Sequence, residues 1–260
     1  MIVKPKIFVR YPPGASGHFI ASLIFSFQKP MRLKNPISAH ENTSLLGAWH
    51  TFNRHHEHPD IFRYTQSHIN LEESINYIKT EFKFEDDRNP YQFFVAHTHV
   101  INPDPIMHAF ENSKLINIKV SDDDADQLAY NFVVKNIIPY SWYRVPIILS
   151  KFQKMYPNKL KNLTADDISI ANVKLLTYLV KFTHKRGYKS RMEFKLNYNY
   201  FEIDWRDIIN KNLATKLDDL CNFLDIELTD ARRKIASNMI TQYADAQITI
   251  PWSITLDDFT

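Results

Sequence analysis

The chain has 260 residues, enough for one domain with long insertions or for two domains. Hydrophobic residues make up 44% and charged residues 23%, and the net charge of +3 indicates no strong attraction to nucleic acid or to a membrane surface. The one cysteine, Cys221, excludes an internal disulfide and suits a reducing compartment, and no apolar run is long enough to span a bilayer. We therefore expect a cytoplasmic protein without nucleic-acid or membrane partners.

Residues 7–27, IFVRYPPGASGHFIASLIFSF, predict a short strand, a tight loop and an apolar helix that begins near Gly17. The chain has four glycines, and Gly14 and Gly17 both lie in this loop, residues 12–18, here called the glycine loop. Glycine tolerates positive φ and close approach of the backbone to a ligand, and a helix N-terminus offers unpaired N–H groups to an anion. We expect the loop to bind phosphate.

Two other interpretations of this stretch remain open. The first is a strand–helix turn that needs two glycines for its own geometry. The second is a secretory signal, with Lys4, Lys6 and Arg10 ahead of the apolar run. The signal is disfavoured because prolines interrupt the region between the charges and the apolar run, and no clear cleavage site follows.

The sequence predicts a long connecting segment after the first helix. Residues 36–60 are polar and rich in histidine. His55, His56 and His58 are potential metal ligands, but no cysteine or helical spacing completes a site, so we favour a solvated loop and predict no metal. Residues 71–84 then predict an amphipathic helix from the spacing of their apolar side chains.

Strand and helix patterns alternate through the rest of the chain. Strands are predicted at 91–98, 115–120 and 194–203, and helices at 102–112 (with a turn), 128–137, 168–183, 213–224 and from Thr229 to about 243. Such alternation is typical of α/β proteins, in which helices flank a mainly parallel central sheet in three layers. We predict a single α/β domain over 1–260 with insertions near 30–70 and 139–190.

Three predicted strands end in residues that can do chemistry. The glycine loop follows the first, His97 and His99 end the second, and Ser121 follows the third. Because ligands of open parallel sheets bind outside the carboxyl ends of the strands, these segments are expected to converge on one site. The glycine loop lacks the Lys-Ser/Thr pair of a Walker A motif, because His18 and Phe19 follow Gly17, so a metal-dependent nucleotidase is disfavoured.

Three blocks in this order resemble the P-loop sulfotransferases, in a divergent form. The opening RYPPGASGHFIASL is similar to that family's loop for the 5′-phosphosulfate. The segment FFVAHTHVINPDPIMHAFENSKLINIKVSDDDADQLAYNF is similar to the part of the family in which a Thr-His pair ends a strand, and a short helix, a strand and a helix with nucleotide contacts follow. The late FEIDWRDI resembles its final strand, followed by a C-terminal helix. The blocks cover about a third of the chain, and the resemblance implies a P-loop-type three-layer sandwich.

The resemblance also implies site residues. His99 falls on the family's catalytic base, and His97 replaces a lysine two places earlier. The implied donor and nucleotide contacts are Gly14, Ala15, Ser16, Gly17, His18, Phe19, Ser121 and Asn131. The chain departs from the family where an arginine binds the nucleotide 3′-phosphate, because Ser121 stands there and three aspartates follow. Those aspartates are expected to cap the next helix.

The resulting expectation is a metal-independent sulfotransferase that moves a sulfuryl group from PAPS (3′-phosphoadenylyl sulfate) to a hydroxyl or amine of a small molecule or carbohydrate. The aromatic and basic segment at 139–157 is a candidate pocket wall, in which residues 140–144 would suit stacking on the acceptor. Two alternatives stay open: a nucleotide-binding kinase on the same loop, and a binding module of the same fold that has lost catalysis. The sequence does not identify the acceptor or the oligomeric state.

Overall fold

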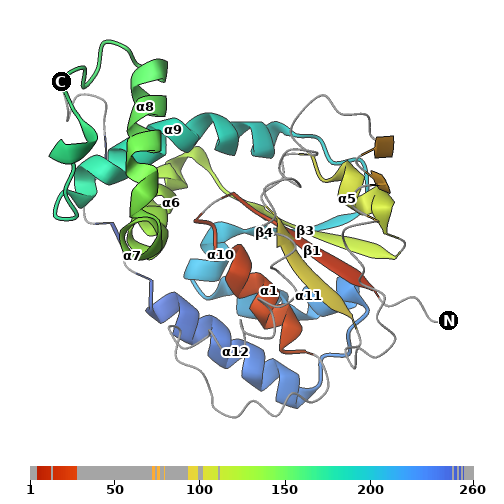
Figure 1. The fold of residues 1–260 in the computed structure, drawn as a ribbon. Helices are drawn as coiled ribbons and strands as arrows, with labels where there is room; N and C mark the ends of the chain where they lie inside the picture. Colours follow the sequence, from red (N-terminus) through yellow and green to blue (C-terminus); the bar gives the residue numbers. More distant parts are fainter. Residues whose placement is uncertain are drawn as a thin grey trace. The chain divides into compact units, whose positions relative to one another are not determined.

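In the computed structural model, the described residues are 5–12, 14–27, 72, 73, 75, 76, 79, 93–98, 102–110, 112–247, 249, 250, 252 and 254. They divide into two compact units (Figure 1). The first comprises Met1–Pro12, Ser16–Lys119 and Phe194–Gln247, and the second Pro13–Ala15, Val120–Glu193 and Ile248–Thr260. The single-domain prediction stays a prediction, and its insertion near 30–70 lies outside the described residues.

The first unit is built on a parallel sheet. Its described strands are β1 (Lys6–Arg10), β2 (Phe94–Thr98), β3 (Ser113–Lys119) and β4 (Tyr200–Asp204), in the order β2-β1-β3-β4. All three pairings between neighbours are parallel, and every residue of β1 is buried, as expected of a central strand with helices on both faces. The predicted α/β fold with a parallel central sheet is confirmed.

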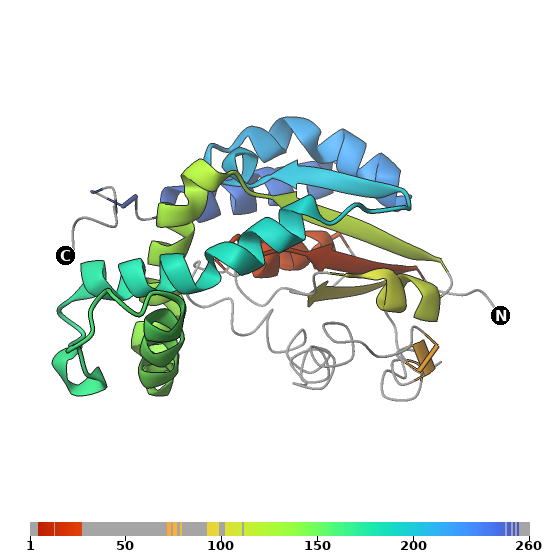
Figure 2. The ribbon, with the colours of Figure 1, turned by 90° about the horizontal axis from the view of Figure 1, so that it is seen from above.

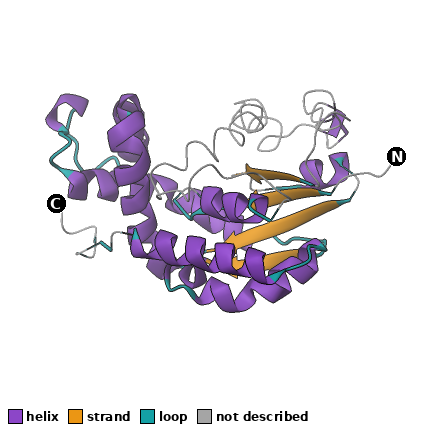
Figure 3. Cartoon of the chain, turned by 90° about the horizontal axis from the view of Figure 1, so that it is seen from below, coloured by secondary structure: helices purple, strands orange, loops and turns teal. Residues whose placement is uncertain are grey.

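Helices of the first unit cover both faces of this sheet (Figures 2 and 3). On one face Phe8 packs with Leu115 and with Ile106 and Ala109 of α5 (Asp104–Ala109). Side chains alternate along a strand, so the neighbours of Phe8 in β1 face the opposite side, where α1 lies against β1 and β2. The remaining helices of the layers are α1 (Gly17–Phe25), α10 (Trp205–Ile209), α11 (Leu217–Leu224) and α12 (Asp230–Asp245).

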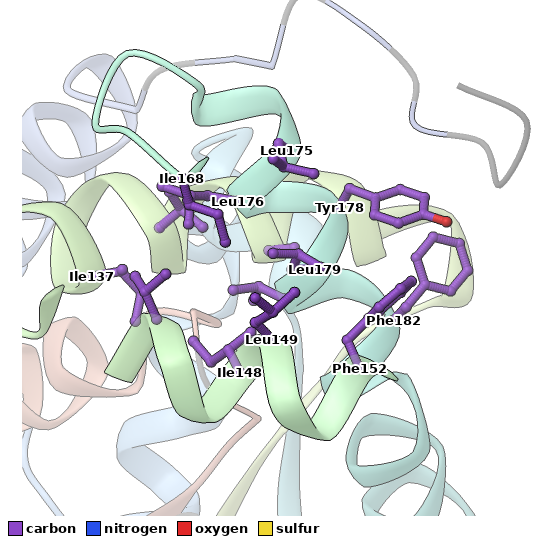
Figure 4. Packing of buried hydrophobic residues seen from close by; sticks show 14 of the residues in the cluster. Ile137, Ile148, Leu149, Phe152, Ile168, Leu175, Leu176, Tyr178, Leu179 and Phe182 are labelled. Carbon is purple, nitrogen blue, oxygen red and sulfur yellow. The ribbon is translucent and has the colours of Figure 1, made fainter. Parts of the chain in front are cut away.

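The second unit is helical in its described part. It consists of α6 (Ala125–Phe132), a π-helical turn (Val133–Ile137), α7 (Ile138–Tyr140), α8 (Val145–Met155) and α9 (Val173–Glu193). Side chains of α8 and α9 point toward one another and form its core (Figure 4). Phe152 lies 5.3 Å from the ring of Tyr178, and Tyr178 4.8 Å from Phe182, which gives this core an aromatic centre.

Two boundaries in this unit differ from the sequence prediction. The helix predicted at 168–183 begins at Val173, because the side chain of Asn172 accepts a hydrogen bond from Leu175 N at 3.1 Å and caps the first turn. The segment expected only as a pocket wall contains α8, whose first turn holds Pro146. Val145 and Ile148 lie on its buried face, whereas Tyr140 and Tyr143 ahead of them are exposed.

Candidate functional site

The glycine loop joins β1 to α1, and packing explains both of its glycines. Gly14 has a φ of +89°, and a Cβ there would lie 2.7 Å from the carbonyl oxygen of Leu128. A Cβ on Gly17 would lie 2.0 to 2.2 Å from three ring carbons of Tyr11. The loop therefore needs glycine at both positions for its own geometry, as the structural interpretation of the motif expected. Anion binding by the same loop stays a prediction.

Ser16 directs its hydroxyl into the first unit rather than outward. Its backbone has a φ of 64°, and its Oγ accepts hydrogen bonds from Trp205 Nε1 at 3.1 Å and from the Tyr243 hydroxyl at 2.8 Å. Burial raises the pKa of Tyr243, so this hydroxyl keeps its proton and donates. Phe19 stacks on the same tyrosine with ring centroids 4.0 Å apart. Both acceptor positions of the Ser16 hydroxyl are therefore occupied within the first unit.

The N-terminus of α1 has the electrostatics of an anion site. No side chain caps it, and its first turn contains no acidic residue. His18 is half-buried and meets the edge of the Tyr11 ring, with centroids 6.0 Å apart. The helix dipole and the first-turn N–H groups favour a negative group at this end, and nothing acidic in the first turn opposes it.

The second predicted strand ends beside the start of this loop. Tyr11 N donates to Thr98 O at 3.1 Å, and position 97 pairs with Val9 in the parallel register. His99 lies outside the described residues, as does the side chain of His97. The structure thus brings Thr98, which precedes His99 in the sequence, next to Tyr11, which precedes the glycine loop. This is the convergence of strand ends that the sequence predicted for these two segments.

Sequence reasoning missed a buried polar pair at the same edge of the sheet. Arg10, 1% exposed, donates from Nη1 to Asn117 Oδ1 at 2.6 Å, and its guanidinium lies 6.0 Å from the Phe194 ring centroid. The strand register extends this pair into a row of Thr98, Arg10, Asn117 and Glu202 across all four described strands. The available signal was the alternation in KIFVR, which puts Lys6, Phe8 and Arg10 on one face.

The predicted nucleotide contacts of the second unit have internal partners. The backbone N and the Oγ of Ser121 donate to Asp124 Oδ2 at 3.0 and 2.6 Å, a capping box that explains one of the three aspartates. Asn131 is buried on α6 and its Oδ1 accepts from Gln127 at 3.0 Å. Lys135 is exposed, yet desolvation by burial lowers the pKa of its ammonium. Nucleotide binding by Ser121 and Asn131 stays a prediction.

Two features are absent from the part of the chain that the structure describes. Within the described ranges, no group of three or more His, Cys, Asp or Glu is placed to hold a metal ion. The histidines at 55–58 lie outside those ranges. Among the helices of the same ranges, none combines the length and the apolar character that crossing a membrane requires.

Comparison with known proteins gives structural likeness alone. No family model and no curated protein matches the chain. Similar solved structures include a sulfotransferase domain of the curacin biosynthetic pathway (13% identity, 99% of this chain, 95% of that chain, TM-score 0.40). A second is a Mycobacterium tuberculosis sulfotransferase (13% identity, 94% of this chain, 77% of that chain, TM-score 0.38). A third is the sulfotransferase domain of the Synechococcus olefin synthase (11% identity, 98% of this chain, 92% of that chain, TM-score 0.36). At these values the likeness carries no argument about this chain's activity.

Proposed function

We propose that the protein is a sulfotransferase that moves a sulfuryl group from PAPS to an acceptor hydroxyl or amine. One observation carries the proposal: the hydrogen bond from Tyr11 N to Thr98 O, which joins the end of β1 to the end of β2. It brings Tyr11, which precedes the glycine loop, beside Thr98, which precedes His99 in the sequence, at the carboxyl edge of a parallel sheet. Ligands of open α/β sheets bind at this edge.

The anionic donor would lie at the N-terminus of α1. First-turn N–H groups of Gly17 and His18 would bind its phosphosulfate oxygens, and the absence of acidic residues from that turn supports this assignment. Gly14, Ala15, Ser16 and Phe19 would complete the loop that holds the donor. The nucleotide end of PAPS would be bound through Ser121 and Asn131, of which Asn131 is buried on α6.

His99 would act as the general base. Its imidazole takes the proton of the acceptor hydroxyl while the acceptor oxygen forms a bond to sulfur, and the bond from sulfur to the phosphate oxygen breaks. Adenosine 3′,5′-bisphosphate leaves with the electrons of that bond. His97 or Lys135 would stabilise the charge on the leaving oxygen, in a transfer governed by positioning and electrostatics. The loop supplies no Lys-Ser/Thr pair for Mg²⁺ with ATP, so the donor we propose needs no metal.

Thermal denaturation with three ligand conditions tests the proposal. Adenosine 3′,5′-bisphosphate at a hundred times its Kd should stabilise the protein by about 2.7 kcal/mol, which raises the Tm by about 5 °C for a chain of this length. ATP with Mg²⁺ and buffer alone should give no shift. Stabilisation by ATP with Mg²⁺ only would establish the kinase alternative.

An assay of transfer separates the enzyme from a binding module. Protein that is stabilised by adenosine 3′,5′-bisphosphate is incubated with PAPS labelled in its sulfate and with phenols, carbohydrates and amines as acceptors. Labelled product identifies the acceptor class. Binding of the bisphosphate without transfer to any acceptor would favour the module that has lost catalysis, and no binding would reject the proposed donor.

A further inference from the structure

Large apolar side chains are exposed on consecutive turns of the second unit. Tyr140, Tyr143 and Ile147 are 80%, 66% and 63% exposed. They lie at the end of α7, in the 3-10 turn Trp142–Arg144 and in the first turn of α8. Tyr143 and Ile147 are four residues apart in one continuous helical stretch, so they lie on the same face of it, and Tyr140 ends the short helix just before that stretch.

Basic side chains continue that face along α8. Arg144, Lys151 and Lys154 are exposed, and Lys151 and Lys154 follow Ile147 at helical spacing. The guanidinium of Arg144 lies 5.7 Å from the Tyr143 ring centroid, and its Nε donates to the Tyr143 hydroxyl at 3.3 Å. We call the six residues the basic aromatic face: Tyr140, Tyr143, Arg144, Ile147, Lys151 and Lys154.

The stretch of sequence that contains this face carries charge of one sign. Residues 127–165 contain six Lys and Arg and no Asp or Glu. The whole chain has a net charge of only +3, so the rest of the chain is net negative. The sequence-based expectation of no membrane partner used the whole-chain value, which averages over this local concentration of positive charge.

The opposite face of α8 fixes the helix in the core of its unit. Val145, Ile148, Leu149 and Phe152 are buried there against residues of α9 (Figure 4). The basic aromatic face is therefore the outer side of a packed helix. Its tyrosines and isoleucine are not required to complete the core beneath them.

We propose that the basic aromatic face binds the surface of an anionic lipid bilayer. Anionic headgroups attract the three cations, while Tyr140, Tyr143 and Ile147 enter the boundary between headgroups and acyl chains. The lysine stems can lie along apolar surface while their ammonium groups stay among the headgroups. The binding that we propose is peripheral, because α8 stays packed on its unit while its outer face contacts the bilayer.

The apolar members favour a bilayer over a nucleic acid. The cations of the face could pair with the phosphates of a nucleic acid as well as with those of lipid headgroups, and the tyrosines could stack on bases. Ile147 has no aromatic face for stacking, yet it is 63% exposed at the middle of the cationic series. An aliphatic side chain in this position gains free energy from a hydrocarbon boundary, in proportion to the apolar area removed from water.

Flotation of the full chain with vesicles tests the proposal. Vesicles of equal parts phosphatidylserine and phosphatidylcholine should bind the protein at low and physiological salt, and vesicles of phosphatidylcholine alone should not. Arg144→Gln, Lys151→Gln and Lys154→Gln together should weaken binding by on the order of a hundredfold, at roughly fivefold per cation. A control variant removes the same charge from exposed positions elsewhere: Lys195→Gln, Lys211→Gln and Lys234→Gln.

A second pair of variants tests the apolar contribution. Tyr140→Ser, Tyr143→Ser and Ile147→Ser together should weaken vesicle binding at least tenfold, whereas Ile170→Ser, at another exposed site of the same unit, should not. Circular dichroism and Tm establish that each variant is folded. Equal binding to both kinds of vesicle, full binding by either face variant, or binding to single-stranded oligonucleotide without vesicle binding would overturn the proposal.

Discussion

The indole Nε1 of Trp205 donates to the Oγ of Ser16 at 3.1 Å, across 189 positions of sequence. Trp205 begins α10 directly after β4, and Ser16 is the residue before α1. The hydrogen bond therefore joins the residue before α1 to the start of the helix that follows β4, the last strand in the sheet order. Because the tryptophan is 1% exposed, its N–H has little access to water as a substitute acceptor.

Substitutions at Ser16 should separate the contribution of its hydrogen bonds to stability from the cost of its strained backbone. Ser16→Ala removes the acceptor and should cost about 1–3 kcal/mol of unfolding free energy. Ser16→Gly removes the same acceptor but relieves the strain of a φ of 64°, so it should be more stable than the alanine variant by about 1 kcal/mol. Urea unfolding measures both. Equal stabilities of the two variants would contradict a strained backbone at this position.

Gly17→Ala should destabilise the first unit strongly. Its Cβ would overlap the Tyr11 ring, with the nearest carbon at 2.0 Å, and both residues are buried. We expect a loss of about 3 kcal/mol, measured as a lower Tm. A neutral Gly17→Ala would rule out the close contact.

Cys221 should make stability depend on pH above its ordinary pKa. Burial, with a smaller contribution from the charge of Asp218, raises the pKa of its thiol from 9.0 to about 11. Between these values the unfolded chain loses the proton that the folded protein keeps, so stability falls as pH rises. The loss should be roughly 2–3 kcal/mol from pH 9 to 11. Other groups titrate in the same range, so Cys221→Ala is compared with the wild type at each pH.

The difference between the two proteins isolates the thiol. Cys221→Ala should lose less stability than the wild type over this range, although it is less stable at neutral pH because it leaves a small cavity. The native thiol should also react with a thiol reagent only as fast as the protein opens. Rapid modification of native protein at neutral pH would show that the thiol is accessible in the folded state.

His18→Glu should weaken binding of the proposed donor. It places a negative charge in the first turn of α1, which now contains none, and opposes an anion there. We expect the Kd for adenosine 3′,5′-bisphosphate to rise on the order of tenfold by calorimetry. His108→Glu makes the same exchange at an exposed position of α5 and should leave the Kd unchanged. Unchanged binding in His18→Glu would place the anion elsewhere.

His99→Ala should abolish sulfuryl transfer and spare donor binding. A general base contributes about 10²–10⁴-fold to a rate, whereas the donor is assigned to the glycine loop. Turnover is measured with labelled PAPS, and binding with adenosine 3′,5′-bisphosphate. His97→Ala should slow transfer less, because we assign it a supporting charge. Retained turnover in His99→Ala would exclude it as the base.

The layered α/β fold could be predicted because its elements have local signals. The apolar run that contains Phe93 and Val95 and the helical spacing of Leu217, Leu220 and Leu224 are visible in short windows of sequence. The α8 helix had weaker signals, because Pro139 and Pro146 indicated interruption although Pro146 stands in a first turn. Proline is common both in loops and in the first turn of a helix, so the sequence alone could not predict that α8 begins at Val145.

The side-chain contacts of the candidate site could not be predicted in the same way. Ser16 was expected to face a ligand, yet its partners Trp205 and Tyr243 lie 189 and 227 positions away. Arg10 was considered only as a cation before an apolar run, and its burial depends on Asn117, which lies beside it only after β1 and β3 pair. Local patterns carry no information about which distant side chain fills a given space.

The register of the sheet has a consequence for how the chain folds. Lys6 pairs with Phe94 and Ser113, and Leu115 pairs with Tyr200, so each pairing among the described strands joins segments that are far apart in sequence. No hairpin can nucleate such a sheet, and each pairing requires closure of a long loop before any backbone hydrogen bond forms. Ribosomal synthesis must therefore reach β4 before the last pairing can form, and until then β3 presents an unpaired edge.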